Sequence, residues 1–323
     1  MTPAARAVGI DVGGTNIKIG AVWSDGRVGS TREIPTHASS GPEAALGRIV
    51  VAVREVLGAD GMPPGEMRAL GIDSAGIVDG ASNLVLDAPN LRSWERFPLA
   101  ARLGEVFGVP AHLVNDVDAM AYAEWKCGAG RGTRHLLCLT LGTGVGGGLI
   151  LDGKPYRGSQ GAGGEVGHMT LDARGPRCPC GSRGCLERYV GAPYIVERTV
   201  AKLASDARPS RMRGVPPAEL SPRRLDDEAR AGDEIAAEVL EETGWWLGAG
   251  LAGLVNVLNP ERIVIGGGVA GAGDLLLEPA RRTLRERAMS VPAAGVLVVP
   301  AALGNDASLV GAALRALERV QEP

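Results

Sequence analysis

The chain has 323 residues, of which 45% are hydrophobic and 22% are charged, and its formal net charge is −3. This length exceeds the size at which one hydrophobic core stops growing, so we expect a globular protein of two domains. The small negative charge gives no electrostatic basis for binding nucleic acid or an anionic membrane. The longest apolar stretch, 245–258, is too short to span a bilayer.

The beginning of the chain shows no secretory signal. Residues 1–7 lead directly into an apolar run, without the apolar core and cleavage site of a signal peptide. Five cysteines are present, and three of them, Cys178, Cys180 and Cys185, lie within eight residues. Without a secretory signal this clustering favours a metal site over disulfides. We therefore expect a cytoplasmic protein.

Three segments combine a short β-type run with a glycine-rich bend, at 7–22, 136–151 and 262–270. In the first two, a second β-type run follows the glycines, at 17–22 and 148–151, so each predicts a β-hairpin with a glycine-rich turn. A Walker A loop and a dinucleotide-binding fingerprint both lead into a helix instead. Neither of these two motifs is therefore present.

Helical and strand patterns alternate between these segments, which is typical of α/β architecture. Residues 207–227, rich in Pro and Arg, are expected to form an exposed loop. Glycines at 248 and 250 mark a candidate break in the longest helical pattern. The other expected elements are an amphipathic helix over 42–58, strands at 69–72 and 112–114, a long helix over 233–258, and a last helix over about 306–320 with Asn305 as its N-cap.

The glycine segments are candidate phosphate-binding loops. A polyphosphate needs backbone N–H groups within contact distance, and only glycine lets the chain approach so closely and adopt positive φ. One such run alone is more typical of a tight structural hairpin, but three together favour phosphate binding. Asp11, just before the first bend, would hold Mg²⁺ through water. The candidate phosphate contacts are Gly13, Gly14, Thr15 and Lys18, then Gly142, Thr143 and Gly144, and finally Gly266, Gly267 and Gly268.

Polar residues follow the strand expected at 112–114. Asn115 and Asp116 stand at its end, where α/β proteins commonly contact ligands. The alternative is that Asn115, Asp116 or Asp118 only caps the next helix, which is expected to begin near Ala119. Asp118 is the better placed for that cap, which leaves the side chain of Asp116 available for a chemical role.

One histidine and three cysteines match a tetrahedral structural zinc site in ligand type and number. Four protein ligands leave no position for water or substrate, so a hydrolytic zinc is not expected. The alternative is a loop with three free thiols, which would be exposed and reactive. The expected ligands are His168, Cys178, Cys180 and Cys185.

Glu165 and Glu187 flank this metal motif. Carboxylates and imidazole suit sugar hydroxyls, because each accepts hydrogen bonds in a fixed geometry. If one ring nitrogen of His168 binds zinc, its tautomer is fixed and the other nitrogen can face a sugar. A surface salt bridge is the alternative role for either glutamate.

Taken in order, these motifs resemble those of the ROK family, which is named for repressors, open reading frames and kinases. One departure is Ala75 before Gly76, where the family usually has a proline that fixes φ, so this turn is less constrained here. The resemblance covers nearly the whole chain and rests on the phosphate motif 11–18, the sugar-side loop 88–91 with Trp94, the pair Asn115–Asp116, the second phosphate loop 141–148, and the sugar and zinc signature 165–168 with 178–187.

The resemblance implies an actin-like, ribonuclease-H-type ATPase fold, with a cleft between two α/β domains. The first domain would span 1–117, with the C-terminal helix 306–323 packing back on it, and the second would span 118–305. The implied reaction is ATP- and Mg²⁺-dependent phosphorylation of a hexose hydroxyl with Asp116 as catalytic base. The implied sugar contacts are Gly76, Asn90, Asn115, Asp116, Glu165, His168 and Glu187.

Glucose, converted to glucose 6-phosphate, is the first expectation for the sugar, with N-acetylmannosamine, N-acetylglucosamine and fructose as alternatives. A homodimer or homotetramer is implied as well. The repressors of the family need a helix-turn-helix ahead of the sugar-binding part. About seven residues precede the first strand and no basic patch is present, so we expect a kinase that binds no nucleic acid.

Overall fold

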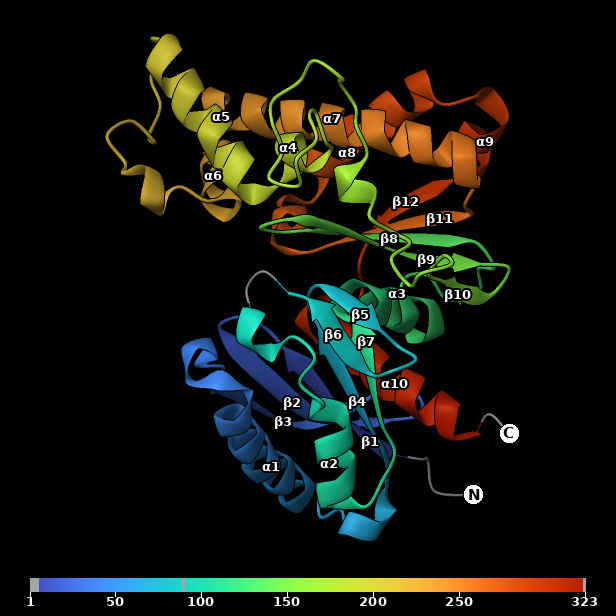
Figure 1. Cartoon of the computed structure of the whole chain (residues 1–323). Coiled ribbons are helices and arrows are strands. Elements are labelled where there is room, and N and C mark those ends of the chain that lie inside the picture. The colour runs from blue at the N-terminus through green and yellow to red at the C-terminus, as the bar shows by residue number, and fades with distance from the viewer. Residues whose placement is uncertain (1–5, 89–90, 322–323) are drawn as a thin grey trace. The chain divides into compact units, whose positions relative to one another are not determined.

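The computed structural model describes residues 6–88 and 91–321. Contacts divide the chain into two compact units (Figure 1). Unit 1 takes the described residues of 1–132, 148–163 and 302–323, and unit 2 takes 133–147 and 164–301. The division expected from the sequence ended the first domain at 117 instead. Both units are α/β, as predicted.

Unit 1 is built on a five-stranded sheet with strand order β3-β2-β1-β4-β7. The three N-terminal strands form an antiparallel meander, and β4 and β7 run parallel to β1. The strands are β1 (Arg6–Val12), β2 (Asn16–Trp23), β3 (Val28–Pro35), β4 (Met67–Ser74) and β7 (Ala111–Asn115), with the small pair β5 (Ile77–Asp79) and β6 (Leu84–Asp87) beside them. The helices are α1 (Gly41–Ala59), α2 (Leu99–Phe107), α3 (Asp116–Cys127) and α10 (Ala307–Gln321).

Both faces of this sheet are buried, because alternate residues of each strand point to opposite faces. Val8 and Ile10 of β1 belong to the core shared with α1 and α2, whereas Ala7 belongs to the core shared with α3 and α10. Asp11 has the parity of Ala7, so its side chain lies on the α10 face.

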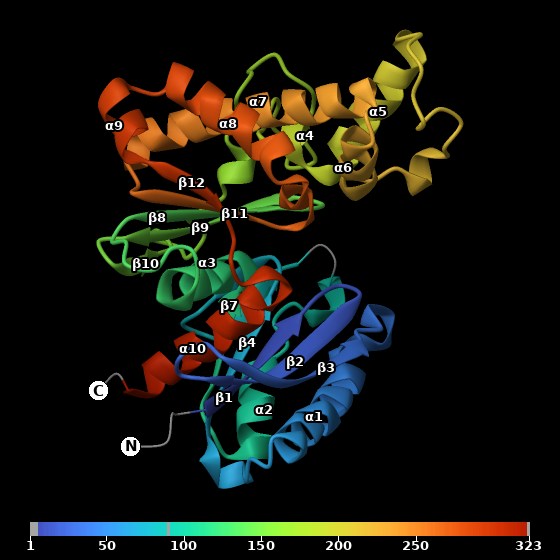
Figure 2. The same cartoon turned by 180° about the vertical axis from the view of Figure 1, so that it is seen from behind.

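Glycines allow α10 to lie directly on the sheet (Figure 2). A Cβ atom on Gly9 of β1 would lie 2.3 Å from the carbonyl oxygen of Leu309, and one on Gly71 of β4 would lie 2.1 Å from that of Ala312. Any larger residue would push the helix away from the strands. This packing places the first turn of α10 beside the carboxyl ends of β1 and β4.

In unit 2, helices α7 and α8 cover one face of the strands (Figure 1). The second sheet has the order β10-β9-β8-β11-β12, of which β8, the first residues of β9, β11 and β12 belong to unit 2, while the rest of β9 and β10 belong to unit 1. Its strands are β8 (Leu136–Leu141), β9 (Val145–Leu151), β10 (Lys154–Tyr156), β11 (Arg262–Gly266) and β12 (Leu297–Pro300). The helices are α4 (Glu187–Val190), α5 (Ala192–Ser205), α6 (Pro222–Arg230), α7 (Glu234–Leu258), α8 (Asp274–Arg287) and α9 (Ser290–Gly295).

The structure corrects three details predicted from the sequence. Helix α7 is unbroken, because Gly248 serves close packing: a Cβ atom there would lie 2.4 Å from the carbonyl oxygen of Ala280. The segment 207–227 is not all loop, since α6 begins at Pro222. Helix α10 begins at Ala307 after a 3₁₀ turn, so Asn305 is not its N-cap.

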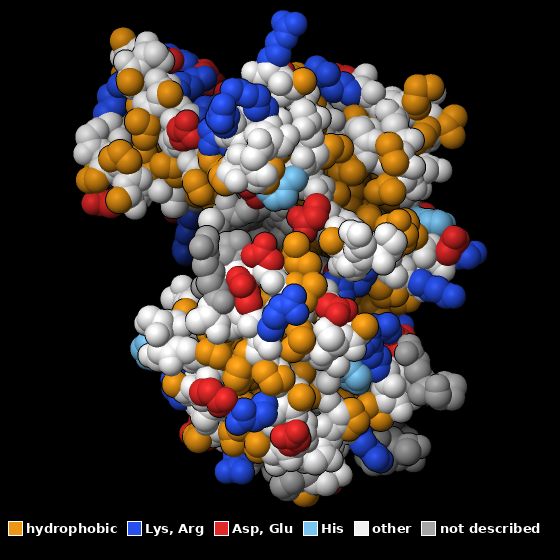
Figure 3. Space-filling view, in the orientation of Figure 1, with side chains coloured by type: hydrophobic (Ala, Val, Ile, Leu, Met, Phe, Trp, Pro, Cys, Tyr) orange, Lys and Arg blue, Asp and Glu red, His pale blue; other side chains and the backbone are white. Residues whose placement is uncertain are grey.

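The surface shows no single dominant charge on the face seen in Figure 3, where Lys and Arg side chains are interspersed with Asp and Glu. Within residues 6–88 and 91–321, none of the helices combines the length and apolar composition needed to cross a membrane.

Candidate functional site

A row of charged residues crosses the sheet of unit 1 beside the first glycine loop. The strand register pairs Glu33 with Lys18, Lys18 with Asp11, and Asp11 with Asp73. Directly paired residues on neighbouring strands point to the same face, so these four side chains form one line. The hydroxyl of Ser308 in α10 donates a hydrogen bond of 3.2 Å to Asp11 Oδ2.

The first glycine loop is a tight turn between β1 and β2. The backbone N–H of Gly13 donates to the carbonyl of Asn16 at 3.0 Å, and Thr36 Oγ1 donates to the carbonyl of Gly13 at 2.7 Å. Gly14 and Thr15 at its tip are exposed, so their backbone can be reached by a ligand. Lys18 follows on β2 and pairs with Asp306.

Three aspartates lie on this side of unit 1, of which Asp73 is fully buried and Asp11 and Asp116 are partly buried. The carboxyl group of Asp73 shares a hydrogen bond with that of Asp11. Burial raises the pKa of Asp73 well above its usual range, and the charges of Asp11 and Asp116 raise it further. Burial likewise raises the pKa of Asp11 and the pKa of Asp116.

Asp73 was not among the residues singled out from the sequence. The available signal was an acid directly after the apolar strand expected at 69–72, but that strand's position between β1 and β7 could not be read from its own residues.

Asn115, rather than Asp118, caps α3. Its Oδ1 accepts hydrogen bonds from the backbone N–H groups of Val117 at 2.9 Å and Asp118 at 3.1 Å. The expectation for Asp118 was wrong because α3 begins at Asp116, which places Asp118 inside the first turn. Asp118 instead pairs with Arg157 at 2.7 Å. Asp116 is the first helical residue, whereas the sequence predicted a helix that begins near Ala119.

Asn115 also fixes the turn that carries Gly76. Its Nδ2 donates to the carbonyl oxygen of Gly76 at 2.9 Å. Gly76 has φ +99°, and a Cβ atom there would lie 2.1 Å from the carbonyl oxygen of Asp87, so only glycine fits. The expected sugar contact Asn90 lies outside the described residues.

The second glycine loop joins β8 to β9 and is tied to Glu187. The backbone N–H of Val145 donates to Glu187 Oε2 at 3.0 Å. A Cβ atom on Gly144 would lie 2.8 Å from the same oxygen, so the glycine makes room for this carboxylate. Thr143 and Gly144 are exposed, and the carbonyl of Gly142 accepts a hydrogen bond of 2.8 Å from the N–H of Ala192.

The third glycine segment lies beside the second, because β11 pairs with β8 in parallel. Gly266 ends β11, and Gly267 follows with φ +87°. A Cβ atom on Gly267 would lie 2.4 Å from the carbonyl oxygen of Leu141, the residue that precedes the second loop. Unit 2 therefore brings two of the three glycine segments together, with Gly267 and Gly268 exposed.

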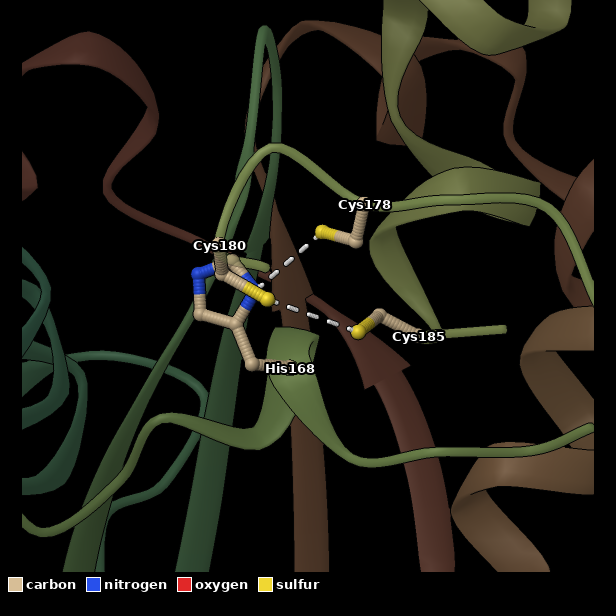
Figure 4. A group of neighbouring side chains, drawn as sticks. All are labelled: His168, Cys178, Cys180 and Cys185. Carbon is tan, nitrogen blue, oxygen red and sulfur yellow. Dashed lines mark hydrogen bonds between the residues drawn. The ribbon is translucent and has the colours of Figure 1, made fainter. Parts of the chain in front are cut away.

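The four expected metal ligands converge in unit 2 (Figure 4). Their ligand atoms all lie within 4.8 Å of one another. His168 Nδ1 lies 3.7 Å from Cys178 Sγ, and the sulfur atoms of Cys180 and Cys185 are also 3.7 Å apart. Bonds of about 2.3 Å to a tetrahedral metal place two sulfur ligands about 3.8 Å apart, so the cluster fits such an ion.

His168 faces the sulfur atoms through Nδ1, which leaves Nε2 directed away from them (Figure 4). It belongs to a short 3₁₀ turn, Val166–His168, and Glu165 precedes this turn as an exposed residue. The predicted residues thus fall into two groups. Unit 1 holds Asp11 to Lys18, Gly76, Asn115 and Asp116, and unit 2 holds the other two glycine segments, Glu165, His168 and Glu187.

Comparison with known proteins gives matches along almost the entire chain. The model of the ROK family matches residues 7–319. The glucokinase of Streptomyces coelicolor is 37% identical over 317 residues, covering 95% of this chain and 96% of that protein. The N-acetylmannosamine kinase of Escherichia coli O157:H7 is 32% identical over 309 residues, covering 95% and 97%.

Solved structures agree with these matches. A ROK family glucokinase from Streptomyces griseus, in complex with glucose and AMPPNP, has a TM-score of 0.79 at 33% identity and covers 97% of this chain and 99% of its own. A ROK family transcriptional regulator, a homolog of the E. coli MLC protein, has a TM-score of 0.87 at 26% identity, covering 98% and 78%. The predicted ROK kinase fold is confirmed, and this chain belongs to the ROK family.

Proposed function

We propose that this ROK-family protein is an ATP-dependent sugar kinase and that its sugar is glucose. The similarity to glucokinases over almost the whole chain supports the reaction and the sugar. The observation that carries the chemistry is Asp116, a partly buried carboxylate directly after β7 in a unit that also holds an exposed glycine loop. Phosphoryl transfer to an alcohol requires these two parts, a base and a phosphate cradle.

Asp116 is suited to accept the proton of the attacking hydroxyl. As the sugar oxygen forms its bond to the γ-phosphorus of ATP, the bond from that phosphorus to the β,γ-bridging oxygen breaks and ADP leaves. The hydroxyl proton passes to Asp116. Burial raises the pKa of Asp116, which makes its carboxylate a stronger base than an exposed aspartate. General-base catalysis of this kind contributes about 10²–10⁴-fold.

The phosphates would be held by the glycine loops and by cations. Exposed backbone at Gly14, Thr15 and Gly144 supplies the N–H groups, and Mg²⁺ at Asp11 neutralises phosphate charge when it is bound. Lys18 pairs with Asp306, so a phosphate would have to compete with this carboxylate for the ammonium group.

The Cys and His cluster is proposed to hold a structural zinc ion. Zinc fits the ligand set because thiolates and imidazole are its preferred protein ligands and all four positions are filled by protein. The ion would fix the loop between Glu165 and Glu187 and would take no part in the chemistry. About one zinc per chain by elemental analysis is expected, and a zinc-free preparation with full activity would refute this role.

A coupled assay of ATP consumption against a panel of hexoses tests the proposed reaction. We expect the highest kcat/KM for glucose, with N-acetylmannosamine as the matched comparison because a kinase for that sugar is also a relative. Asp116→Asn is expected to bind glucose while kcat falls by at least about 10². A kcat near that of the wild type in this variant would refute Asp116 as the base.

We also propose that the protein works in the cytoplasm as a homodimer or homotetramer. The family resemblance supports this assembly, and light scattering on the purified protein measures it directly. A monomer at micromolar concentration would overturn the proposed assembly without affecting the proposed reaction.

A further inference from the structure

The second glycine loop is held at both ends by the segment that begins at Glu187. The backbone N–H of Val145 donates to Glu187 Oε2 at 3.0 Å, and the carbonyl oxygen of Gly142 accepts a hydrogen bond of 2.8 Å from the N–H of Ala192. Within the loop, the N–H of Gly142 donates to the carbonyl oxygen of Gly144 at 2.9 Å. The loop therefore depends on this segment for the placement of both its ends.

These bonds leave two donors of the loop for a ligand. The N–H groups of Thr143 and Gly144 have no acceptor within the part of the chain that the structure describes, and both residues are exposed. Successive N–H groups in a turn form a typical anion-binding concavity. Glycine-rich backbone has wide conformational freedom of its own, so the anchor at Glu187 decides where these donors point.

Glu187 connects this loop with the metal motif of unit 2. It stands two residues after the expected ligand Cys185. A Cβ atom on Gly167, the neighbour of the expected ligand His168, would lie 2.0 Å from the carbonyl oxygen of Val145, so that turn packs directly on the end of the loop. Val145 is thus contacted by both segments that supply metal ligands, and a metal ion would fix the separation of these segments.

We propose that Glu187 is a positioning residue of the nucleotide site. Its carboxylate holds the second glycine loop so that the N–H groups of Thr143 and Gly144 meet the phosphates, and it ties this loop to the metal motif. This inference rests on the proposed kinase function, in which the loop binds ATP. The role is separate from the sugar contact implied by the family resemblance, because Oε2 is directed to the loop.

Two other roles for Glu187 lead to different results. A residue that only contacts the sugar would leave nucleotide binding unchanged when no sugar is present. A residue that only supports the folding of unit 2 would weaken the binding of adenosine as much as that of AMPPNP, a non-hydrolysable ATP analogue. Adenosine has no phosphate, so a misplaced phosphate loop leaves its affinity unchanged. Comparison of the two ligands therefore separates the three roles.

Isothermal titration calorimetry of the full-length protein without sugar measures both affinities. We expect Glu187→Ala to weaken AMPPNP binding about tenfold, the equivalent of one lost hydrogen bond to a charged group, and to change adenosine binding less than about twofold. Glu187→Gln keeps an oxygen that can accept from Val145, so its loss should be about threefold. Glu241→Gln is the matched control, because Glu241 forms an exposed ion pair with Arg282 in the same unit.

Cys180→Ser tests the tie to the metal motif, because it removes the exposed ligand of the cluster. This variant should also bind AMPPNP more weakly than the wild type. If Glu187 transmits the effect, the loss in the double variant with Glu187→Ala should be smaller than the product of the two single losses. Independent losses, which multiply, would overturn the tie between the metal motif and the loop.

Unchanged AMPPNP affinity in Glu187→Ala, or an equal loss of adenosine affinity, would overturn the proposal, as would the absence of AMPPNP binding by the wild type. Circular dichroism checks the folding of each variant, and Glu187→Gln carries the test if Glu187→Ala does not fold. A protein that phosphorylates no sugar but loses AMPPNP affinity on Glu187→Ala would refute the proposed reaction and keep the positioning role.

Discussion

Glu124 is predicted to hold unit 1 together at two of the places where the chain leaves or re-enters it. Its side chain is fully buried in α3. Oε2 accepts a hydrogen bond of 2.7 Å from the backbone N–H of Ala129, and Oε1 accepts two of 2.9 Å from those of Ala302 and Leu303. The chain first leaves unit 1 after Gly132 and, after an intermediate return at 148–163, finally re-enters it at Ala302. One carboxylate therefore joins the segment before the first exit to the segment after the last re-entry.

The cost of removing this carboxylate follows from the three N–H groups that it satisfies. A buried donor left without a partner costs about 1–3 kcal/mol, which gives an upper range near 9 kcal/mol for three. Ala302 is exposed and Leu303 and Ala129 are half-buried, so water replaces part of the loss. We therefore expect Glu124→Ala to lower the free energy of unfolding by about 2–4 kcal/mol. Glu124→Gln keeps one oxygen and should cost about 1–2 kcal/mol.

Urea unfolding followed by far-ultraviolet circular dichroism measures both changes. Glu55→Gln is the control, because Glu55 forms only an exposed ion pair with Arg32 and such pairs contribute about 0–1 kcal/mol. An unfolding free energy for Glu124→Ala within 0.5 kcal/mol of this control, a margin of about the usual effect of a surface substitution, would refute the reasoning. Loss of kcat without loss of stability would also contradict it.

Three further predictions concern the site and its support. Burial raises the pKa of Asp116 above 3.8, so kcat/KM should fall as the pH drops through that raised value, and a flat acid limb in the pH–rate profile would exclude it as the base. Asn115→Ala should destabilise the protein by about 1–2 kcal/mol in urea unfolding, whereas Asn115→Asp keeps the cap and should cost less. Gly71→Ala should cost about 1–3 kcal/mol or more by the same measurement, because its Cβ atom would meet the backbone of Ala312, while Gly47→Ala, in open space on α1, should not destabilise.

Local patterns in the sequence were sufficient to predict several features of this protein. The glycine-rich bends predicted hairpins, and the register Asp11↔Lys18 confirms the first. The period of apolar residues predicted α1 over 42–58, and the helix spans Gly41–Ala59. The spacing of one histidine and three cysteines predicted a metal site, and their ligand atoms converge. Each of these depends on residues close together in the chain, whose preferences act before any tertiary contact forms.

Other features were decided only by the tertiary structure. The third glycine segment lies beside the second because β11 pairs with β8 across more than a hundred residues. Asn115 rather than Asp118 caps α3, because the end of β7 determines where the helix begins.

Asp73 gives the clearest case of this dependence. Its own sequence neighbours show only an acid after an apolar run, while its burial comes from β1 and β7 on either side and α10 on its face. Contacts between residues far apart in the sequence decide which ionisable side chains are buried next to one another. These contacts therefore determine the electrostatics of the site.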